Sequence, residues 1–257
     1  MQTYVPPEAV RWGIRDAIIG LAVFIAVILL GVAFVVTTHP DAENPDVVGA
    51  FTLVSTLAGY GALFIVIVLA SRRRGLGSLR ADFGFRLRPV DLAIGLGIGL
   101  LAKIISVVIG VVAISITGHT PEQGNFVLPS SPLWIVVNGV LIATLIAPIM
   151  EELFFRGLVL RAIRNYVLRF RGRTQPAGQQ TQETAIVVAI LGNSIAFALL
   201  HLYESSDVTL LIALGGGTLV IGLLNSMIAI RTGRLGAAIV AHVVFNGISI
   251  VTAIAIA

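Results

Sequence analysis

A series of seven apolar runs constrains the fold of this chain more than any other feature. A helix needs about 20 mostly apolar residues to cross the hydrocarbon core of a bilayer. The runs leave little sequence between them, and they extend over Ala17 to Val36, Val47 to Ala70, Leu92 to Thr117, Leu133 to Met150, Thr184 to Leu200, Val208 to Ile230 and Leu235 to Ala257. We therefore predict an all-α fold, a polytopic transmembrane helix bundle of about seven spans, with eight spans as the alternative.

Composition agrees with lipid as the solvent of the folded chain. Hydrophobic residues make up 57% of the 257 residues and charged residues only 12%, whereas a soluble domain of this length needs more polar surface to cover its core. We expect residues 1–257 to form a single membrane domain. The chain contains no cysteine, which excludes a disulfide framework, a thiolate nucleophile and a cysteine-based metal site.

The positive charges are distributed unevenly between the two ends of the predicted bundle. A formal net charge of +4 is compatible with nucleic-acid binding, but here the positions of the charges matter more than their sum. Every arginine lies at the N-terminus or in the second, fourth or sixth connection, and the alternate connections carry acidic residues. Because Lys and Arg bias loops toward the cytoplasm, we expect an integral protein of the cell membrane, plasma or inner, with a cytoplasmic N-terminus and no nucleic-acid partner.

Two adjacent carboxylates follow the fourth apolar run without a turn signal. The apolar sequence resumes after Glu151 and Glu152, so we expect the helix to continue through them. Glu152 and Arg156 are then i and i+4, the spacing of an ion pair, whereas Glu151 lies about 100° round the axis and has no cation at i+3 or i+4. A carboxylate in an apolar pocket suits a general base that deprotonates water. The alternative is that the helix ends here and both carboxylates meet headgroup water.

Two further polar clusters lie in the fifth and seventh runs. His201 ends the fifth run, with Phe197 one turn earlier on the same helix face; a histidine at a helix end is also typical of an interfacial hydrogen bond. His242 and Asn246 are i and i+4 in the seventh run and project into the same space. They would suit an oxyanion site, or the imidazole would suit a metal. The alternative is an interhelical hydrogen bond that stabilises packing.

The third run contains a buried cation and a packing motif. Lys103, the only lysine, lies roughly 18 Å into the helix at 1.5 Å per residue, too deep to reach the interface easily. It needs either a buried carboxylate as partner or burial in its neutral form, and the sequence favours neither. Gly95 and Gly99 form a small-xxx-small spacing, which predicts close helix packing.

Three motifs in the order EExxxR, FxxxH and HxxxN, which begin at Glu151, Phe197 and His242, resemble the CPBP family of intramembrane peptidases. This family is also called the CAAX-protease and bacteriocin-processing or Abi family, and it includes the Rce1-type proteases. The resemblance covers residues 131–257, which we interpret as the catalytic core, and leaves residues 1–130 as three N-terminal helices of a kind that varies in that family. Three motifs in order at helix-compatible positions make a specific signal.

The resemblance implies an intramembrane endopeptidase that hydrolyses a peptide bond with a glutamate-activated water. In the roles it implies, Glu151 activates the water, Glu152 and Arg156 support it, His201 helps to hold the water, and His242 with Asn246 stabilises the oxyanion. The expected partners are a peptide or protein substrate and membrane lipid. Two other functions stay open, a proton-coupled transporter and a non-catalytic immunity or scaffold protein with the same fold.

The need for a metal is a separate question. The family has been described both as metalloproteases and as glutamate proteases, and Glu151, His201 and His242 would supply a His₂Glu zinc set with an open position. The chain has no HExxH motif. We favour a mechanism without a required cofactor, because a carboxylate base and a two-donor oxyanion site complete the chemistry.

Helix depth places one condition on this site. With seven straight helices, His201 would lie ~26 Å from the inner surface and His242 only ~10 to 12 Å from it, at 1.5 Å rise per residue. The two imidazoles approach each other only if the fourth helix continues past Glu151 toward Arg164 and the fifth begins in the cytoplasm or tilts strongly.

Overall fold

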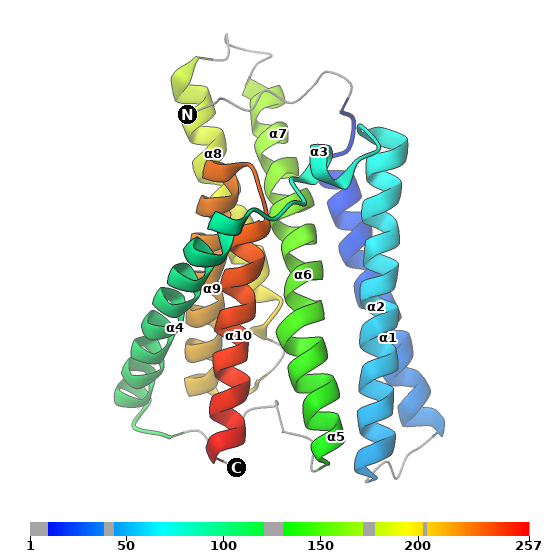
Figure 1. Cartoon of the computed structure of the whole chain (residues 1–257), viewed down its shortest axis with the longest axis vertical. Coiled ribbons are helices and arrows are strands. Elements are labelled where there is room, and N and C mark those ends of the chain that lie inside the picture. Colours follow the sequence, from blue (N-terminus) through cyan, green and yellow to red (C-terminus); the bar gives the residue numbers. More distant parts are fainter. Residues whose placement is uncertain (1–9, 39–43, 121–130, 172–177, 203–204, 257) are drawn as a thin grey trace.

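The computed structural model describes residues 10–38, 44–120, 131–171, 178–202 and 205–256, and in these ranges it contains helices and no strand. Figure 1 shows the helices standing side by side as a bundle. Their bounds are α1 Ile14–Thr38, α2 Pro45–Arg74, α3 Leu79–Phe83, α4 Pro89–Thr117, α5 Pro132–Trp134, η1 Ile135–Ile146, α6 Ala147–Glu152, η2 Leu153–Val159, α7 Leu160–Arg171, α8 Gln179–Leu199, α9 Val208–Thr232 and α10 Gly236–Ile256.

Seven helices in the described ranges are long and apolar enough to cross a membrane. This number confirms the predicted all-α polytopic bundle and selects seven over eight for this part of the chain. Their membrane-facing sides carry many exposed aliphatic side chains, which lipid would cover. The end of the seventh predicted run, Ala257, lies outside the described residues.

The fourth span is much longer than its apolar run. It extends without a break from Pro132 to Arg171, over 40 residues, so the alternative in which the helix ends at the two glutamates is wrong. The next helix, α8, begins at Gln179, five residues before the predicted fifth run at Thr184. The continuation of the fourth helix past Glu151 meets the first of the two conditions on the depth of the histidines, and α8 begins earlier than its apolar run.

Two π-helical segments flank the short α6 turn that carries both glutamates. Pro148 has no N–H, and its ring clashes with the carbonyl four residues earlier in a regular α-helix. The wider η1 precedes it and ends with the Ala147 N–H bonded to the Ile142 carbonyl, five residues back. Segment η2 ends in the same way, from Leu160 to Phe155. Such π-helical turns are rare and occur frequently at functional sites.

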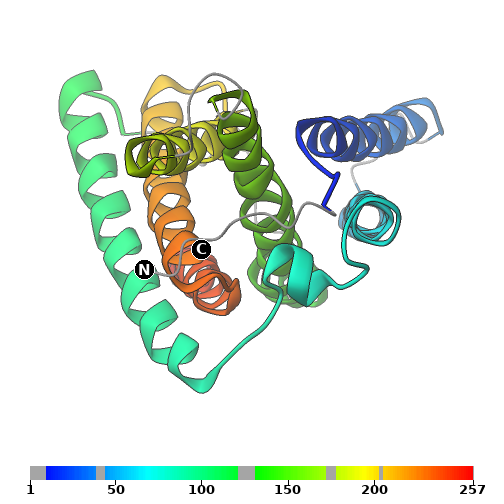
Figure 2. The ribbon, with the colours of Figure 1, turned by 90° about the horizontal axis from the view of Figure 1, so that it is seen from above.

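The central helices bring the two halves of the chain together. Seen from above in Figure 2, the α1 and α2 pair lies on one side of the bundle and α4 on the opposite side. Helix α10 contacts α4, α9, η1 and α6, and α6 also contacts α2. The two glutamates at the end of α6 therefore lie between the last helix and the N-terminal half.

Close packing and a buried ion pair fix α10 against α4. A Cβ atom at Gly95 or Gly99 would come within 2.7 Å of the Ala237 carbonyl oxygen or 2.6 Å of the Ala241 carbonyl oxygen, so glycine permits the predicted close approach. Just before α10, Arg234 Nε donates to Asp91 at 3.1 Å. This hydrogen bond raises the pKa of Arg234 above its ordinary value, because the carboxylate stabilises the charged guanidinium.

Candidate active site

Glu152 is the centre of a buried polar cluster. Its side chain is fully buried, and its Oε1 lies 3.0 Å from Arg156 Nη1, in the ion pair that the i, i+4 spacing predicted. The same oxygen accepts a hydrogen bond from Asn225 Nδ2 at 3.0 Å and lies 2.9 Å from His242 Nδ1. A carboxylate paired with an arginine acts as an acceptor, so the His242 Nδ1 carries the proton. Glu152 thereby fixes the orientation of the His242 ring.

Glu151 has a different set of neighbours. Its side chain is 17% exposed, in contrast to the fully buried Glu152 beside it. The Tyr60 hydroxyl, from α2, donates to Glu151 Oε1 at 2.5 Å. Glu151 Oε2 lies 3.8 Å from His242 Nε2, and within the described ranges Glu151 forms no ion pair with a lysine or arginine. It is the accessible carboxylate of the pair.

The Phe197 ring connects the elements of the cluster. The Arg156 guanidinium lies 4.3 Å from its centroid, a distance at which a cation is attracted to the aromatic face. The ring of His242 meets it edge-on with 5.6 Å between centroids, and that of His201 lies at 4.5 Å. Phe197 is fully buried. It therefore contacts His201, His242 and Arg156 at once.

His201 and Asn246 lie at the periphery of the cluster. His201 Nδ1 is 2.8 Å from the Phe197 carbonyl oxygen, and it donates to that oxygen because a carbonyl can only accept. Asn246 Nδ2 donates to the Ala143 carbonyl at 2.9 Å, which engages one of its two amide hydrogens. The structure thus brings together Glu151, Glu152, Arg156 and His242, whereas His201 and Asn246 have no direct hydrogen bond to these four among the described residues.

The predicted zinc set does not fit this geometry. Within the described ranges, no group of three or more His, Cys, Asp or Glu side chains is arranged to hold a metal ion. We therefore derive no catalytic step through Glu151, His201 and His242 as metal ligands.

Lys103 lies outside the cluster and joins α4 to α10. Its Nζ donates to Ser249 Oγ at 2.5 Å and lies 4.5 Å from the centroid of the Phe245 ring. Pairing of Lys103 with a buried carboxylate, one of two predicted alternatives, is absent from the described residues. The Lys103 Nζ contacts a hydroxyl and an aromatic face instead.

Two residues of the cluster were missed in the sequence. Asn225 on α9 contacts Glu152 and also donates to the Ala238 carbonyl at 3.0 Å, and Tyr60 on α2 contacts Glu151. Both are uncharged polar residues within apolar runs, a weaker signal than a charge because they cost less to bury. Tyr60 lies in residues 1–130, so the site draws on the N-terminal helices as well as the predicted catalytic core.

Fold and site together define a polytopic α-helical membrane protein with a carboxylate, histidine and arginine cluster buried between its spans. Residues 132–248 match the family described as type II CAAX prenyl endopeptidase Rce1-like. The matched segment contains all six predicted site residues, confirms the resemblance to the CPBP, Rce1-like family, and indicates a membrane-embedded protease. Comparison with curated proteins and with solved structures gave no match.

Proposed function

We propose that this protein is an intramembrane endopeptidase in which Glu151 activates the attacking water. The observation that carries the proposal is the contrast between two adjacent carboxylates on one helical turn. Glu152 is buried, forms an ion pair with Arg156 and is hydrogen bonded to Asn225 and His242. Glu151 is partly exposed and faces the other nitrogen of the same histidine. Neighbouring carboxylates in unlike environments are the usual basis for divided roles in hydrolysis.

In the proposed reaction, Glu151 takes one proton from water while the water oxygen forms a bond to the peptide carbonyl carbon. The carbonyl π electrons move to the oxygen and give a tetrahedral oxyanion. When the C–N bond breaks, the proton on Glu151 passes to the leaving nitrogen, so the carboxylate is restored. The products are one new carboxyl group and one new amine.

The distances around Glu151 support this assignment. A water with hydrogen bonds of about 2.8 Å to both Glu151 Oε2 and His242 Nε2 would bridge the 3.8 Å between them. Tyr60 holds the other carboxylate oxygen and fixes the direction of the free one. For the oxyanion, we assign the remaining amide hydrogen of Asn246 as a donor.

The proposed substrate is a peptide or protein segment that reaches Glu151 from the membrane or from the arginine-rich end of the bundle. The family description names CAAX prenyl endopeptidases, so a prenylated peptide is one substrate class to test beside an unmodified one. We further propose that the protein lies in the cell membrane with its N-terminus in the cytoplasm, as the arginine distribution predicts.

Cleavage of defined peptides by purified protein tests the proposal. The detergent-solubilised protein is incubated with farnesylated and unmodified versions of the same peptides, and products are identified by mass spectrometry. We expect discrete endoproteolytic products with the wild type and none above background with Glu151→Gln. Equal turnover by the two proteins would show that the cleavage does not depend on Glu151 and would overturn the proposal.

A further inference from the structure

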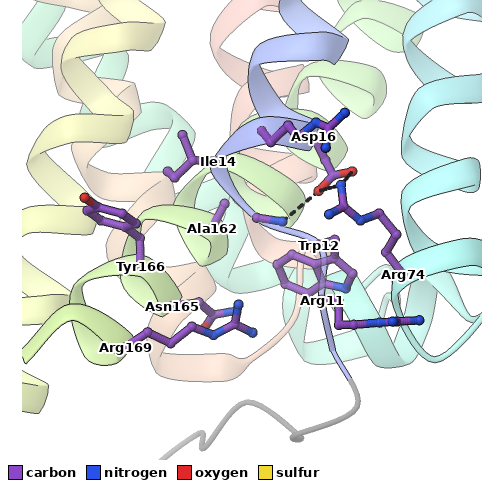
Figure 3. Close-up of a pocket in the computed structure, with 11 residues that line it drawn as sticks. Arg11, Trp12, Ile14, Asp16, Arg74, Ala162, Asn165, Tyr166 and Arg169 are labelled. Carbon is purple, nitrogen blue, oxygen red and sulfur yellow. Dashed lines mark hydrogen bonds and ion pairs between the residues drawn. The ribbon is translucent and has the colours of Figure 1, made fainter. Parts of the chain in front are cut away.

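A separate cavity of about 230 Å³ lies at the arginine-rich end of the bundle, where the segment before α1 meets the end of α2 and the face of α7 (Figure 3). Its charged and amide lining consists of Arg11, Arg15, Asp16, Arg74, Asn165 and Arg169. None of these residues belongs to the cluster around Glu152, and the proposed protease reaction makes no use of the cavity.

The lining is strongly cationic, because four arginines face one aspartate. Asp16 is already satisfied, since it accepts from Arg74 Nη1 at 3.0 Å and from the Gly13 amide at 2.9 Å. Arg169 donates to the Val10 carbonyl at 2.6 Å, an uncharged partner. The side chains of Arg11 and Arg15 contact no carboxylate within the described part of the chain. The cavity therefore has an excess of positive charge that an anion would neutralise.

Asn165 adds a buried polar group with no protein partner to the same lining. The residue is 1% exposed, and neither its amide nitrogen nor its amide oxygen has a hydrogen-bond partner among the described residues. Buried side-chain amides are nearly always hydrogen bonded, so an unpaired one indicates a ligand or solvent partner. Figure 3 shows Asn165 beside Arg169, across the cavity from Asp16 and Arg74. An amide N–H next to guanidinium groups suits the oxygens of a phosphate.

The side chains beside the cavity are those expected near a membrane interface. Immediately after its α1 residues, Ile18 and Ile19 are exposed to the surroundings, as expected of side chains that face acyl chains. On the α7 side, the exposed rings of Tyr166 and Phe170 stack with their centroids 6.2 Å apart, and exposed aromatic residues gather at headgroup depth. A phosphate in the cavity would therefore be close to the hydrocarbon boundary.

We propose that this cavity binds a phosphate group, and that the phosphate belongs to the headgroup of an anionic phospholipid. Its volume is below the roughly 300 Å³ at which pockets begin to enclose drug-sized ligands, which suits a headgroup whose acyl chains remain outside along α1. In the orientation proposed above, this end lies at the cytoplasmic leaflet, where anionic lipids create a negative surface potential.

Lipid binding by the purified full chain tests the proposal. Binding of phosphatidylglycerol and phosphatidylcholine is measured by native mass spectrometry, with thermal unfolding as a second readout. We expect phosphatidylglycerol alone to bind tightly and to raise the unfolding temperature. Arg11→Gln/Arg15→Gln should weaken this binding at least about tenfold. The matched control is Arg72→Gln/Arg73→Gln, which removes the same charge from exposed positions at the end of α2 outside the cavity; it should change binding by less than about twofold.

A variant that leaves the net charge unchanged distinguishes a specific phosphate site from general electrostatic attraction between the arginines and anionic lipid. Asn165→Leu should leave the unfolding temperature without lipid unchanged or higher, because it removes an unpaired buried amide, and should weaken phosphatidylglycerol binding by about fivefold. Equal binding of the two lipids, or equal losses in the cavity and control double variants, would overturn the proposal.

Competition with inorganic phosphate shows whether the bound phosphate group belongs to a lipid headgroup or is a free ion. With a lipid headgroup as the ligand, millimolar phosphate neither displaces phosphatidylglycerol nor raises the unfolding temperature. Phosphate that does both with an affinity comparable to that of the lipid would confirm the phosphate site and overturn the assignment to a lipid.

Discussion

The polar cluster around Glu152 and the cavity at the arginine-rich end both contain several charged side chains, but they differ in burial and in charge balance. In the cluster, Glu152 and Arg156 are fully buried and paired. In the cavity, arginines exceed acidic groups and most of them reach the surface. A buried charge is costly unless the protein itself neutralises it, so an excess of one sign is tolerated only where an outside ligand or solvent meets it. This contrast indicates internal chemistry for the first region and an external ligand for the second.

The largest expected effect is on catalysis by the cluster. Glu151→Gln should lower the rate of peptide cleavage by about 10² to 10⁴, the usual contribution of a general base. Its unfolding temperature should stay close to that of the wild type, because Glu151 is partly exposed and has no arginine partner among the residues that the structure describes. Cleavage assays and thermal unfolding of the same preparation check this. Loss of fold together with activity would contradict the separation of roles between the two glutamates.

The next effect is on the stability of the cluster. Glu152→Gln leaves Arg156 buried beside a neutral side chain and should cost about 3 to 5 kcal/mol of unfolding free energy. Denaturant unfolding in detergent measures the change. The control is the double variant Glu152→Gln/Arg156→Met, which removes the unpaired charge and should recover part of the loss. A Glu152→Gln protein as stable as the wild type would mean that the pair does not stabilise the fold.

A smaller effect is expected at the contact between the two halves of the chain. Tyr60→Phe removes the hydroxyl that donates to Glu151 and should reduce the cleavage rate about tenfold, as expected for one hydrogen bond to a charged group. The comparison of kcat with KM locates the effect, because a hydroxyl that orients the base lowers kcat and leaves KM nearly unchanged. An effect on KM alone would place Tyr60 in substrate binding instead.

The smallest expected effect is that of salt, which should screen the charges of the cavity but not those of the buried cluster. Raising the salt concentration from about 0.1 M to about 1 M shortens the Debye length from about 10 Å to about 3 Å. Binding of phosphatidylglycerol at the exposed arginines should weaken severalfold, whereas unfolding of the lipid-free protein should change little because the Glu152–Arg156 pair is out of contact with solvent. If salt lowered the unfolding temperature of the lipid-free protein as markedly as it weakened lipid binding, the ion pair would be screened like the exposed arginines. The contrast between a buried and an exposed region would then be wrong.

The sequence predicted the parts of the structure that depend on local spacing and on the cost of burying charge. Hydropathy located the spans, and the i, i+4 rule located the Glu152–Arg156 pair. Tyr60 and Asn225 were not predicted, because their contacts depend on how distant helices pack. An uncharged polar side chain also costs little to bury in an apolar run, so it does not stand out in the sequence. The π-helical turns around α6 were equally hidden, because these segments are too short and too uniformly apolar to show a period that would separate a π-helix from an α-helix.

The cavity, too, could not be predicted from the sequence alone. Its arginines were visible in the sequence as a topology signal, but the cavity forms only where residues from three segments meet, Arg11 to Asp16, Arg74 and Ala162 to Arg169. The unpaired amide of Asn165 is a property of the packed structure and has no counterpart in the spacing of residues.

Isotope incorporation tests most directly whether the oxygen added to the peptide carbonyl carbon comes from water, as the proposed role of Glu151 requires, or from the enzyme. Peptide is cleaved under single-turnover conditions in H₂¹⁸O, with enzyme in excess, and the new carboxyl group is examined by mass spectrometry. If water attacks the carbonyl carbon, one ¹⁸O atom appears in the new carboxyl group in that first turnover. A first-turnover product whose new carboxyl group carries only ¹⁶O would mean that an enzyme oxygen had attacked instead, and would contradict the proposed role of Glu151.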